Sequence, residues 1–386
     1  MSIERDRAHV TAQAATGAAP GNRKDEHVDL AQGLRGERAA AASGAGAGHP
    51  GVWDDVRFVH HSFPGIARDA VDTSTVVCGR DWAVPFHINA MTGGSEKTGR
   101  INADLARAAA QTGVAMATGS VSPALRDPAL AGTFEVVREN APEAFLMSNI
   151  SPEMTVEQAG AAVELIDADA LQIHVNPAQE LVMPEGDRDF THWLDRIGEI
   201  VEGVDVPVVV KEVGFGVSPR TVAEVAARGV AAVDVSGRGG TNFIDIENRR
   251  REKQEYAYLS GWGQTAAECL LDLQVEGAPL VRTSGSPVQM LASGAVSTPL
   301  DVVRALALGA SAVGVSGHFL NVLLTNGYDA LVEELHDWTE QVRTLMTLLG
   351  ASTVAELQKV DVLVTGSTAE FARLRGVDLA ALARRS

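Results

Sequence analysis

One strand-like run in this chain turns polar where it should end: Ala170-Leu171-Gln172-Ile173-His174-Val175-Asn176-Pro177-Ala178-Gln179-Glu180. Its apolar residues suit a buried strand, and Pro177 should end that strand because proline fixes φ and has no backbone N–H group. Several donors and acceptors follow within a few positions, and such groups are costly to bury without partners. This layout is expected of a (β/α)8 barrel, where the chemistry lies at the carboxyl ends of the strands.

A repeating rhythm extends outward from this run. Short apolar runs that end in Gly, Ser or Asn alternate with Ala-rich amphipathic runs, and the pattern predicts strands at 85–89, 114–118, 145–149, 171–176, 208–213, 232–236, 289–293 and 312–316. Helices are expected at 97–112, 133–140, 155–166, 190–202, 218–228, 264–273 and 299–308, followed by a last helical region at 318–349. The pairs Ser218-Pro219 and Thr298-Pro299 are typical helix starts, and Gly309 is a typical helix stop.

Eight alternations favour an α/β fold with a closed parallel barrel, a TIM barrel. The rival, an open doubly wound sheet, normally carries a G-x-G-x-x-G turn after its first strand. Here Ala90-Met91-Thr92-Gly93-Gly94 stands at that place. The barrel is expected to carry an N-terminal extension and a long insertion, Gly237 to Gly263, after its sixth strand. Long loops on this face usually cover the site or form an interface.

Composition narrows the class of protein. The 386 residues carry a formal charge of −18, which argues against nucleic-acid or anionic-membrane partners. No stretch approaches the roughly 20 apolar residues needed to span a bilayer, and no signal-peptide core is evident before the first strand. Cys78 and Cys269 fit no metal or redox spacing, so a cytoplasmic location is expected. Residues 1–21 are expected to be a disordered tail, and residues 22–386 one barrel domain.

Polar residues recur at the predicted strand ends, from Asn89 in the first strand to Ser316-Gly317 in the eighth. The turns Ser293-Gly294-Ala295 and Ser316-Gly317 follow strands seven and eight, the usual phosphate site of such barrels. Two ordinary glycine turns are the alternative. Lys211 is a cation inside an apolar strand and is expected to face an anion. A structural ion pair with a carboxylate such as Glu212 is the competing interpretation.

Two carboxylates after the fourth strand, Glu180 and Glu185, are either metal ligands or surface charges. A Mg2+ site typically takes one or two carboxylates and completes its shell with water and substrate phosphate. The sequence alone leaves both interpretations open for these two residues.

Taken together, these segments resemble the FMN-dependent type 2 isopentenyl-diphosphate isomerases. The resemblance runs from about Arg23 to Val377. It rests on Arg23-Lys24-x-x-His27, Ile88-Asn89-Ala90-Met91-Thr92-Gly93-Gly94, Gln172-Ile173-His174-x-Asn176-x-x-Gln179-Glu180, Met183-Pro184-Glu185-Gly186-Asp187-Arg188, Val210-Lys211-Glu212-Val213-Gly214, Gly239-Gly240-Thr241-Asn242-Phe243, Trp262-Gly263 and Ala292-Ser293-Gly294. Each string is short, but their joint order and spacing are highly specific.

The resemblance implies a 1,3-allylic proton shift between isopentenyl and dimethylallyl diphosphate. It implies reduced FMN and Mg2+ as cofactors, NAD(P)H as the reductant, and a homo-oligomer of four or eight barrels. Flavin contacts would come from Ala90, Met91, Thr92, Ser120, Asn149, Lys211, Ser236 and Thr241. The FMN phosphate would lie on Ser293, Gly294, Ala295, Ser316 and Gly317.

The resemblance also assigns the substrate side of the site. Arg23, Lys24 and His27 would bind the diphosphate, although a solvated charged helix explains their spacing equally well. Glu180 would hold Mg2+, and the catalytic set would be His174, Asn176 and Gln179 around the isoprene group. Gln179 is the family's acid/base candidate, but an amide is a poor acid and a poor base near neutral pH. Orienting the alkene, or relaying a proton through water, fits its chemistry better.

The chain departs from some members in Ala295, where a second glycine can stand, and in Pro177, which stiffens the motif before Gln179. Two rival functions share the expected barrel. An FMN-dependent 2-hydroxy-acid oxidase would need a histidine base and an arginine clamp at the end of a late strand, where this chain has Ser-Gly three times. A non-catalytic barrel that binds FMN or a diphosphate is the second rival, and the retained Lys211, Gln179 and Glu180 argue against it.

Overall fold

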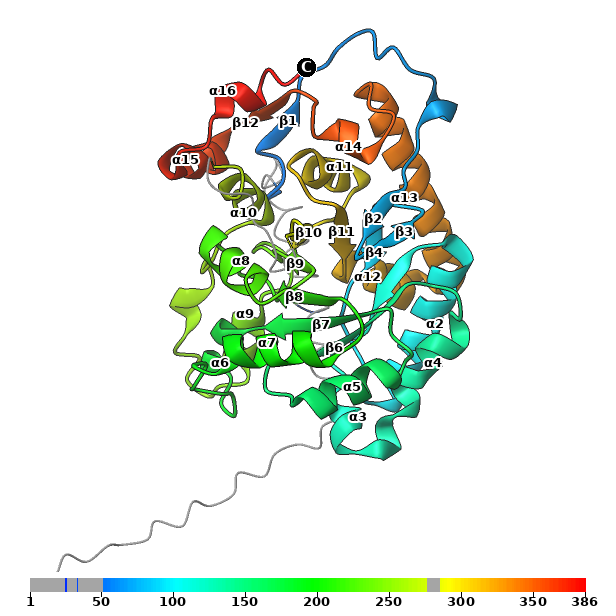
Figure 1. Cartoon of the computed structure of the whole chain (residues 1–386), viewed down its shortest axis with the longest axis vertical. Helices are drawn as coiled ribbons and strands as arrows, with labels where there is room; N and C mark the ends of the chain where they lie inside the picture. The colour runs from blue at the N-terminus through cyan, green and yellow to red at the C-terminus, as the bar shows by residue number, and fades with distance from the viewer. Residues whose placement is uncertain (1–24, 26–32, 34–50, 276–284) are drawn as a thin grey trace, which may run out of the picture.

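Eight parallel strands close into a barrel at the centre of the computed structural model, which describes Asp25, Gly33 and residues 51–275 and 285–386 (Figure 1). The barrel strands are β4 (Phe86–Ile88), β5 (Ala115–Ala117), β6 (Leu146–Ile150), β7 (Ala170–Val175), β8 (Val208–Glu212), β9 (Ala232–Asp234), β10 (Gln289–Ser293) and β11 (Ala312–Val315). Each pairs with its sequence neighbour, and β11 returns to β4. The predicted (β/α)8 barrel is confirmed.

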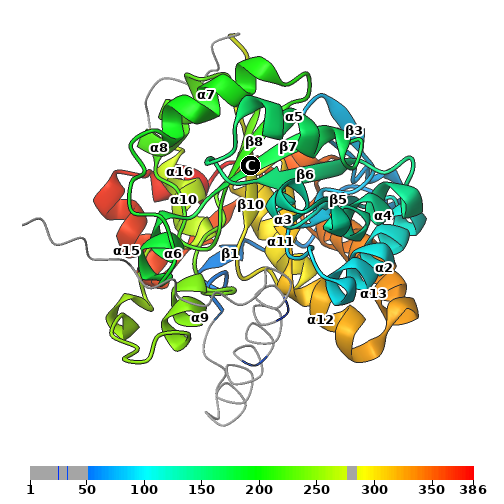
Figure 2. The same ribbon diagram turned by 90° about the horizontal axis from the view of Figure 1, so that it is seen from below.

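Helices surround the strands on the outside, as Figure 2 shows. Those that follow the predicted pattern are α2 (Glu96–Thr112), α4 (Gly132–Asn140), α5 (Val156–Glu164), α7 (Trp193–Gly203), α8 (Pro219–Ala226), α10 (Ala266–Asp272), α11 (Pro299–Ala307), α12 (Gly317–Asn326) and α13 (Tyr328–Leu348). Ser218 and Thr298 cap α8 and α11 with Pro at the first turn, as expected. The last helical region is two helices, because the chain breaks at Gly327, where φ is +91°.

Several elements were not predicted. They are β1 (Val56–Phe58), β2 (Thr75–Val77), β3 (Arg80–Trp82), β12 (Val362–Val364), η1 (Arg68–Ala70), η2 (Pro128–Leu130), η3 (Ala257–Leu259), α3 (Ser122–Arg126), α6 (Pro177–Val182), α9 (Phe243–Arg249), α14 (Val354–Leu357), α15 (Gly366–Arg375) and α16 (Leu379–Leu382). Most are shorter than two turns or have three residues, so they carry little periodic signal. β1 pairs with β12, which ties the two ends of the described barrel region together.

The inside of the barrel is divided into an apolar lower part and a polar upper part. Small and aliphatic side chains such as Ala115, Met147, Val209 and Leu291 pack together inside it. The β2–β3 hairpin adds Trp82, whose ring lies 5.2 Å from that of Phe145 at the amino-terminal end. Toward the carboxyl end, two positions further along three of these strands, the residues are polar: Asn149, Lys211 and Ser293. The hairpin therefore closes one end of the barrel, and the polar residues line the other.

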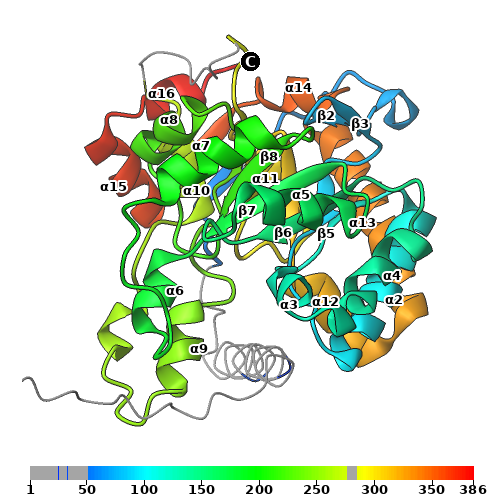
Figure 3. The ribbon, with the colours of Figure 1, turned by 60° about the horizontal axis from the view of Figure 1, so that its bottom comes forward.

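Three of the unpredicted helices, α3, α6 and α9, follow β5, β7 and β9, and therefore lie at the carboxyl ends of the strands. Figure 3 shows α6 beside α9 on this side, and their backbones are in contact. The long insertion after β9 thus holds a short helix rather than an unstructured loop. Among the described residues no helix is both long and apolar enough to cross a membrane.

Candidate active site

A continuous chain of hydrogen bonds crosses the upper inside of the barrel, and we call it the floor network. It starts at His174 Nδ1, which lies 2.8 Å from Asn149 Oδ1, and Asn149 Nδ2 donates to Gln172 Oε1 over 3.1 Å. Gln172 donates to Asn89, and Asn89 Nδ2 donates to Asp234 Oδ2 over 2.9 Å. The remaining members are Lys211, Ser236 and Ser293. The network thus joins β4, β6, β7, β8, β9 and β10.

Lys211 is the cation of the floor network and is 6% exposed. Its Nζ donates to Ser236 Oγ over 3.0 Å and to the Glu212 backbone oxygen over 2.7 Å. The nearest carboxylate oxygen, Asp234 Oδ2, is 3.6 Å away. The competing interpretation from the sequence, a structural ion pair with a carboxylate, is met by Asp234, whereas the Glu212 side chain named as an example does not pair with Lys211. Glu212 alternates with Lys211 along β8 and points to the outer side, where it accepts from Gly214 N and Phe215 N.

Burial and hydrogen bonds pull the pKa of Glu212 in opposite directions. Removal from water raises it to about 7, although backbone N–H groups and Lys211 lower it. His87, also inside the barrel below Asn89, has its pKa lowered to about 4 by burial. Neither ring nitrogen of His87 has a hydrogen-bond partner among the described residues. A neutral imidazole is therefore expected at this position.

A second chain of hydrogen bonds lies at the mouth of the barrel, and we call it the rim chain: Glu180, Asn176, Gln179, Glu247, Arg250 and Glu185. Asn176 Nδ2 donates to Gln179 Oε1 over 3.1 Å and to Glu180 Oε1 over 2.9 Å. Gln179 Nε2 donates to Glu247 Oε1 over 2.9 Å. Arg250 pairs with two carboxylates. Its Nη1 lies 2.6 Å from Glu247 Oε2, and its Nη2 lies 2.7 Å from Glu185 Oε1.

Local geometry explains how the rim chain is held. Pro177 ends β7 as expected, but it also starts α6 with Asn176 as its N-cap residue, so the motif turns into a helix at once. The following loop folds back because Gly186 packs on Glu180, where a Cβ would lie 2.1 Å from the backbone oxygen. Arg188 stabilises this loop by donating to the backbone oxygens of Met183 and Glu180.

Glu247 was not selected from the sequence. It lies on α9, inside the long insertion, and is 0% exposed. Asn242 caps this helix by accepting from Ile244 N and Asp245 N, and that capping pattern ahead of an apolar pair was a usable signal. Only a structure could show that α9 packs on α6 and brings this carboxylate to Gln179.

Of the predicted flavin residues, Asn149, Lys211 and Ser236 belong to the floor network, and the Ala90 N–H donates to Asn89 within it. Thr92, 2% exposed, has a buried hydroxyl with no described partner. Ser120 Oγ lies 2.9 Å from Ser122 Oγ, and the Thr241 oxygen approaches the turn at Gly214. Ala90 and Met91 directly follow Asn89 at the end of β4. A buried hydroxyl without a described partner suits a polar ligand such as a flavin ring.

The predicted phosphate turns follow the paired strands β10 and β11, so they share one edge of the barrel. None of the described residues accepts a hydrogen bond from the backbone N–H groups of Gly294, Ala295 or Gly317. A Cβ at Gly294 would lie 2.1 Å from the Gly237 oxygen, so glycine is required there. Free N–H groups beside the start of α12 are suited to a phosphate.

Two non-glycine residues near these turns have left-handed backbones. φ is +36° at Ser236 and +57° at Ala295, which costs each residue roughly 1–3 kcal/mol. Ala295 therefore keeps the glycine-like turn despite its side chain. Trp53, which the sequence did not single out, supports this turn by donating from Nε1 to the Gly294 oxygen over 3.1 Å.

Arg23, Lys24 and His27 lie outside the described residues, as do residues 1–21. Their described neighbour Asp25 accepts a 2.7 Å hydrogen bond from Ser95 Oγ. Ser95 is the N-cap of α2, directly after the Met91-Thr92-Gly93-Gly94 turn.

Within the described part of the chain, no three His, Cys, Asp or Glu side chains gather as a metal site. The Glu180 carboxylate accepts from Asp187 N over 3.0 Å as well as from Asn176. Each carboxylate oxygen has two lone pairs, so Glu180 suits one Mg2+ bond in a shell completed by a phosphate. Glu185 has its pKa lowered, since the contact with Arg250 outweighs the opposing effect of burial.

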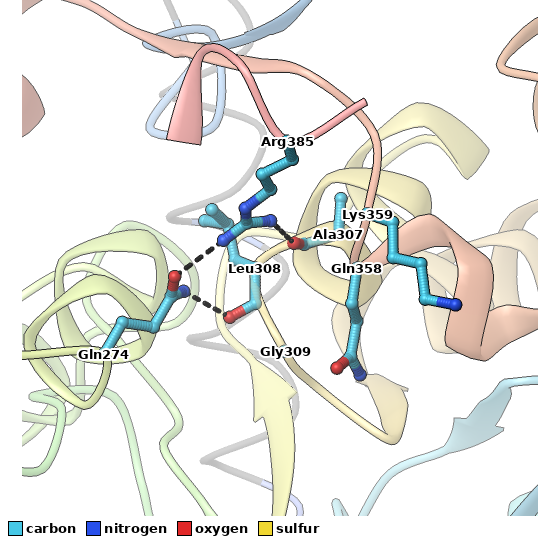
Figure 4. A pocket seen from close by; sticks show the side chains of 7 residues that line it. All are labelled: Gln274, Ala307, Leu308, Gly309, Gln358, Lys359 and Arg385. Atoms are coloured by element: carbon cyan, nitrogen blue, oxygen red, sulfur yellow. Dashed lines mark hydrogen bonds between the residues drawn. The ribbon is translucent and has the colours of Figure 1, made fainter. Parts of the chain in front are cut away.

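A cavity of about 340 Å3 lies elsewhere, next to the chain segment before β11 (Figure 4). Its cation Arg385 donates to Gln274 Oε1 and to the Ala307 oxygen, at the last turn of α11. This is a cation at a helix C-terminus, a common stabilising arrangement. The cavity therefore belongs to the packing of the C-terminal segment.

Comparisons with known proteins agree with this geometry. The model of the FMN-dependent dehydrogenase family matches residues 126–364. An isopentenyl-diphosphate delta-isomerase of Streptomyces sp. (strain CL190) is 51% identical over 94% of this chain and 95% of its own length. Those of Kitasatospora griseola and Nocardia farcinica are 50% and 47% identical, over 94% and 95% of this chain and 95% and 96% of their own lengths. The chain belongs to the FMN-dependent type 2 isopentenyl-diphosphate delta-isomerase family.

Solved structures share the fold of this isomerase family member at low sequence identity. A flavocytochrome b2 variant with benzoylformate has a TM-score of 0.61 at 21% identity, covering 85% of this chain and 79% of its own. A mandelate oxidase variant with a monooxide FMN adduct has a TM-score of 0.58 at 18% identity, covering 85% and 100%.

Proposed function

We propose that this protein interconverts isopentenyl and dimethylallyl diphosphate by a 1,3-allylic proton shift, using reduced FMN and Mg2+. The observation that carries the proposal is the position of Gln179. Its amide lies between Asn176 and the buried carboxylate of Glu247, at the mouth of a barrel whose floor presents Lys211. A titratable group, Glu247, thus lies next to the proposed isoprene pocket, at the mouth of a barrel whose inner network holds the Lys211–Asp234 pair.

The reaction requires a strong acid in a dry pocket. An isolated alkene is a very weak base, and its protonation creates a tertiary carbocation. When bound, reduced FMN supplies an acidic N5–H and an electron-rich ring that stabilises positive charge. NAD(P)H is the proposed reductant, and the reaction itself leaves the flavin without net redox change.

Lys211 is proposed to lie at N1/O2 of the flavin, where the reduced ring holds negative charge. The surrounding residues Ala90, Met91, Thr92, Ser120, Asn149, Ser236 and Thr241 would hold the ring. The turns Ser293-Gly294-Ala295 and Ser316-Gly317 would take the phosphate. The orphaned Thr92 hydroxyl and the free backbone N–H groups support these assignments.

Gln179 and Glu247 are proposed to act together on the second proton of the reaction, the one that leaves the carbocation. A carboxylate can hold a proton that an amide cannot, and Glu247 Oε1 accepts directly from Gln179 Nε2. Gln179 then positions the alkene and connects it to Glu247, whose carboxylate is paired with Arg250 over 2.6 Å. His174 and Asn176 would line the isoprene pocket.

The diphosphate is proposed to lie on the metal side of the rim chain. Glu180 would hold Mg2+ against it, and Arg23, Lys24 and His27 would bind its oxygens. A tetramer or octamer is the proposed assembly. These assignments rest on the resemblance to the family and on the position of Glu180 at the barrel mouth.

The oxidase alternative is weaker on structural grounds. β9, β10 and β11 lead into Ser236-Gly237, Ser293-Gly294 and Ser316-Gly317. The histidine after β11, His318, is engaged with Glu334 over 2.6 Å and stacks on Trp338. It is part of the contact between α12 and α13 rather than a free base.

An anaerobic product assay tests the proposal. The protein is incubated with isopentenyl diphosphate, FMN and Mg2+, with or without dithionite, and a parallel aerobic sample receives a 2-hydroxy acid. Dimethylallyl diphosphate in the reduced sample alone supports the isomerase. Bound flavin without product would indicate a binding protein, and oxygen-dependent oxidation of the hydroxy acid would indicate an oxidase.

A further inference from the structure

We infer that Asp234 is a positioning residue that balances the charge of Lys211 and thereby sets how strongly the site prefers reduced over oxidised FMN. This inference rests on the proposed FMN site. Asp234 lies on β9 inside the barrel and is 0% exposed. No function discussed above uses it.

Three hydrogen-bond donors surround the Asp234 side chain. Its oxygens accept from Asn89 Nδ2 over 2.9 Å, from Ser293 Oγ over 2.7 Å and from Ser236 N over 3.1 Å. Asn89 Nδ2 and Ser236 N can donate but cannot accept. A protonated carboxyl group would therefore offer them fewer acceptor sites. The surroundings therefore favour the carboxylate form.

Asp234 also lies close to Lys211. The two residues stand opposite each other in the β8–β9 ladder, and Nζ lies 3.6 Å from Asp234 Oδ2. That separation exceeds a good hydrogen bond, and Nζ donates instead to Ser236 and to the Glu212 oxygen. Asp234 thus compensates the charge of the Lys211 ammonium group. Ser236 and the Glu212 oxygen, which accept from Nζ, fix the direction of that group.

Reduction of the flavin would change the charge that Lys211 faces. With oxidised, neutral flavin, Asp234 balances part of the ammonium charge, while Ser236 Oγ and the Glu212 oxygen also accept from Nζ. With reduced, anionic flavin bound, the same carboxylate would repel the ring through the low dielectric of the barrel interior. Asp234 therefore lowers the preference for the reduced form below the value that Lys211 alone would produce.

The test is Asp234→Asn, which removes the charge and keeps the shape. Dissociation constants are measured for oxidised FMN in air and for reduced FMN under anaerobic dithionite at neutral pH. We expect the ratio of the oxidised to the reduced Kd to rise at least tenfold over the wild type. Tenfold corresponds to a positive shift of about 30 mV in the two-electron midpoint potential of bound FMN, which spectroelectrochemistry measures independently.

The matched control is Asn89→Ala, which removes a hydrogen bond to the same carboxylate but no charge. It is expected to change the affinities of both flavin forms together and to leave their ratio within about threefold, roughly 0.7 kcal/mol. If Asp234→Asn does not fold, Asp234→Ser removes the same charge with a smaller polar side chain.

The outcomes separate the inference from the function on which it rests. An unchanged or lowered ratio in Asp234→Asn, in a wild type that binds both flavin forms, overturns the inference alone. A shift of equal size in Asn89→Ala also overturns it, because the effect would then come from packing. A wild type that binds neither flavin form overturns the proposed function and, with it, the inference.

Discussion

The floor network and the rim chain are both continuous runs of hydrogen bonds, but they are built differently. The floor network comes from barrel strands and pairs one buried cation, Lys211, with one buried carboxylate, Asp234. The rim chain comes from two loops and short helices, and two of its three carboxylates, Glu247 and Glu185, share Arg250. The contrast fits the proposed division of the site, with a charge-balanced surface of barrel strands for the flavin and an acidic mouth of loops and short helices for Mg2+ and the second proton transfer.

The strongest test of the difference between the floor network and the rim chain is Glu247→Gln, which removes the titratable group from the rim chain. We expect the isomerisation rate to fall about 10²–10⁴-fold, the usual contribution of a positioned acid or base. FMN affinity should stay unchanged, because the floor network is intact. Initial rates and flavin titrations measure the two effects, and Glu252→Gln, at an exposed position of the same insertion, is the matched control. Normal turnover by Glu247→Gln would show that the proton acceptor is elsewhere.

The next largest effect is a pH-dependent change in stability. It comes from Glu212 on β8, one of the strands that carry the floor network. The pKa of Glu212 is about 7, above its ordinary value of 4.5, so the folded state holds this proton more tightly than the unfolded state does. The wild type should therefore lose stability relative to Glu212→Gln as the pH rises through this window, by up to about 3 kcal/mol. Urea unfolding of both proteins at about pH 5 and about pH 8 measures it. A pH-independent difference would mean that Glu212 is ionised normally.

Lys211→Ala tests the floor network from the cofactor side. Charged hydrogen bonds contribute about 1.5–3 kcal/mol, so reduced FMN should bind at least about tenfold more weakly. Oxidised FMN should lose much less, because its N1/O2 region carries no full charge. Titration of both forms under anaerobic and aerobic conditions distinguishes them, with Lys253→Ala on the exposed insertion as control. Equal weakening of both forms would remove the electrostatic role of Lys211.

The smallest expected effect separates the two carboxylates of the β7 loop. Glu180→Gln should raise the Mg2+ concentration for half-maximal rate several-fold, up to about tenfold or 1.4 kcal/mol. Glu185→Gln should leave it nearly unchanged, because Arg250 already neutralises that carboxylate. Rate titrations with Mg2+ compare the two variants. The opposite ranking would place the ion at Glu185.

The comparison also explains what the sequence could and could not predict. All eight barrel strands were found, because a buried parallel strand carries its apolar pattern locally. Lys211 stood out because it is a charged residue in an apolar strand. Asp234 could have been selected for the same reason, since it lies two residues after Ala232 and on the same face of its strand. Glu247 was missed because its role depends on the packing of α9 against α6, which no local pattern encodes. Gln179 was recognised, but its bond to a buried carboxylate appears only in three dimensions.

The most direct measurement is the initial rate of dimethylallyl diphosphate formation against the fraction of FMN that is reduced, with Mg2+ and isopentenyl diphosphate held saturating and oxygen excluded. We expect the rate to rise in proportion to the reduced fraction from a value near zero, while the flavin spectrum stays constant during turnover. A rate that is independent of the flavin's redox state, or flavin oxidation in step with product formation, would contradict the account.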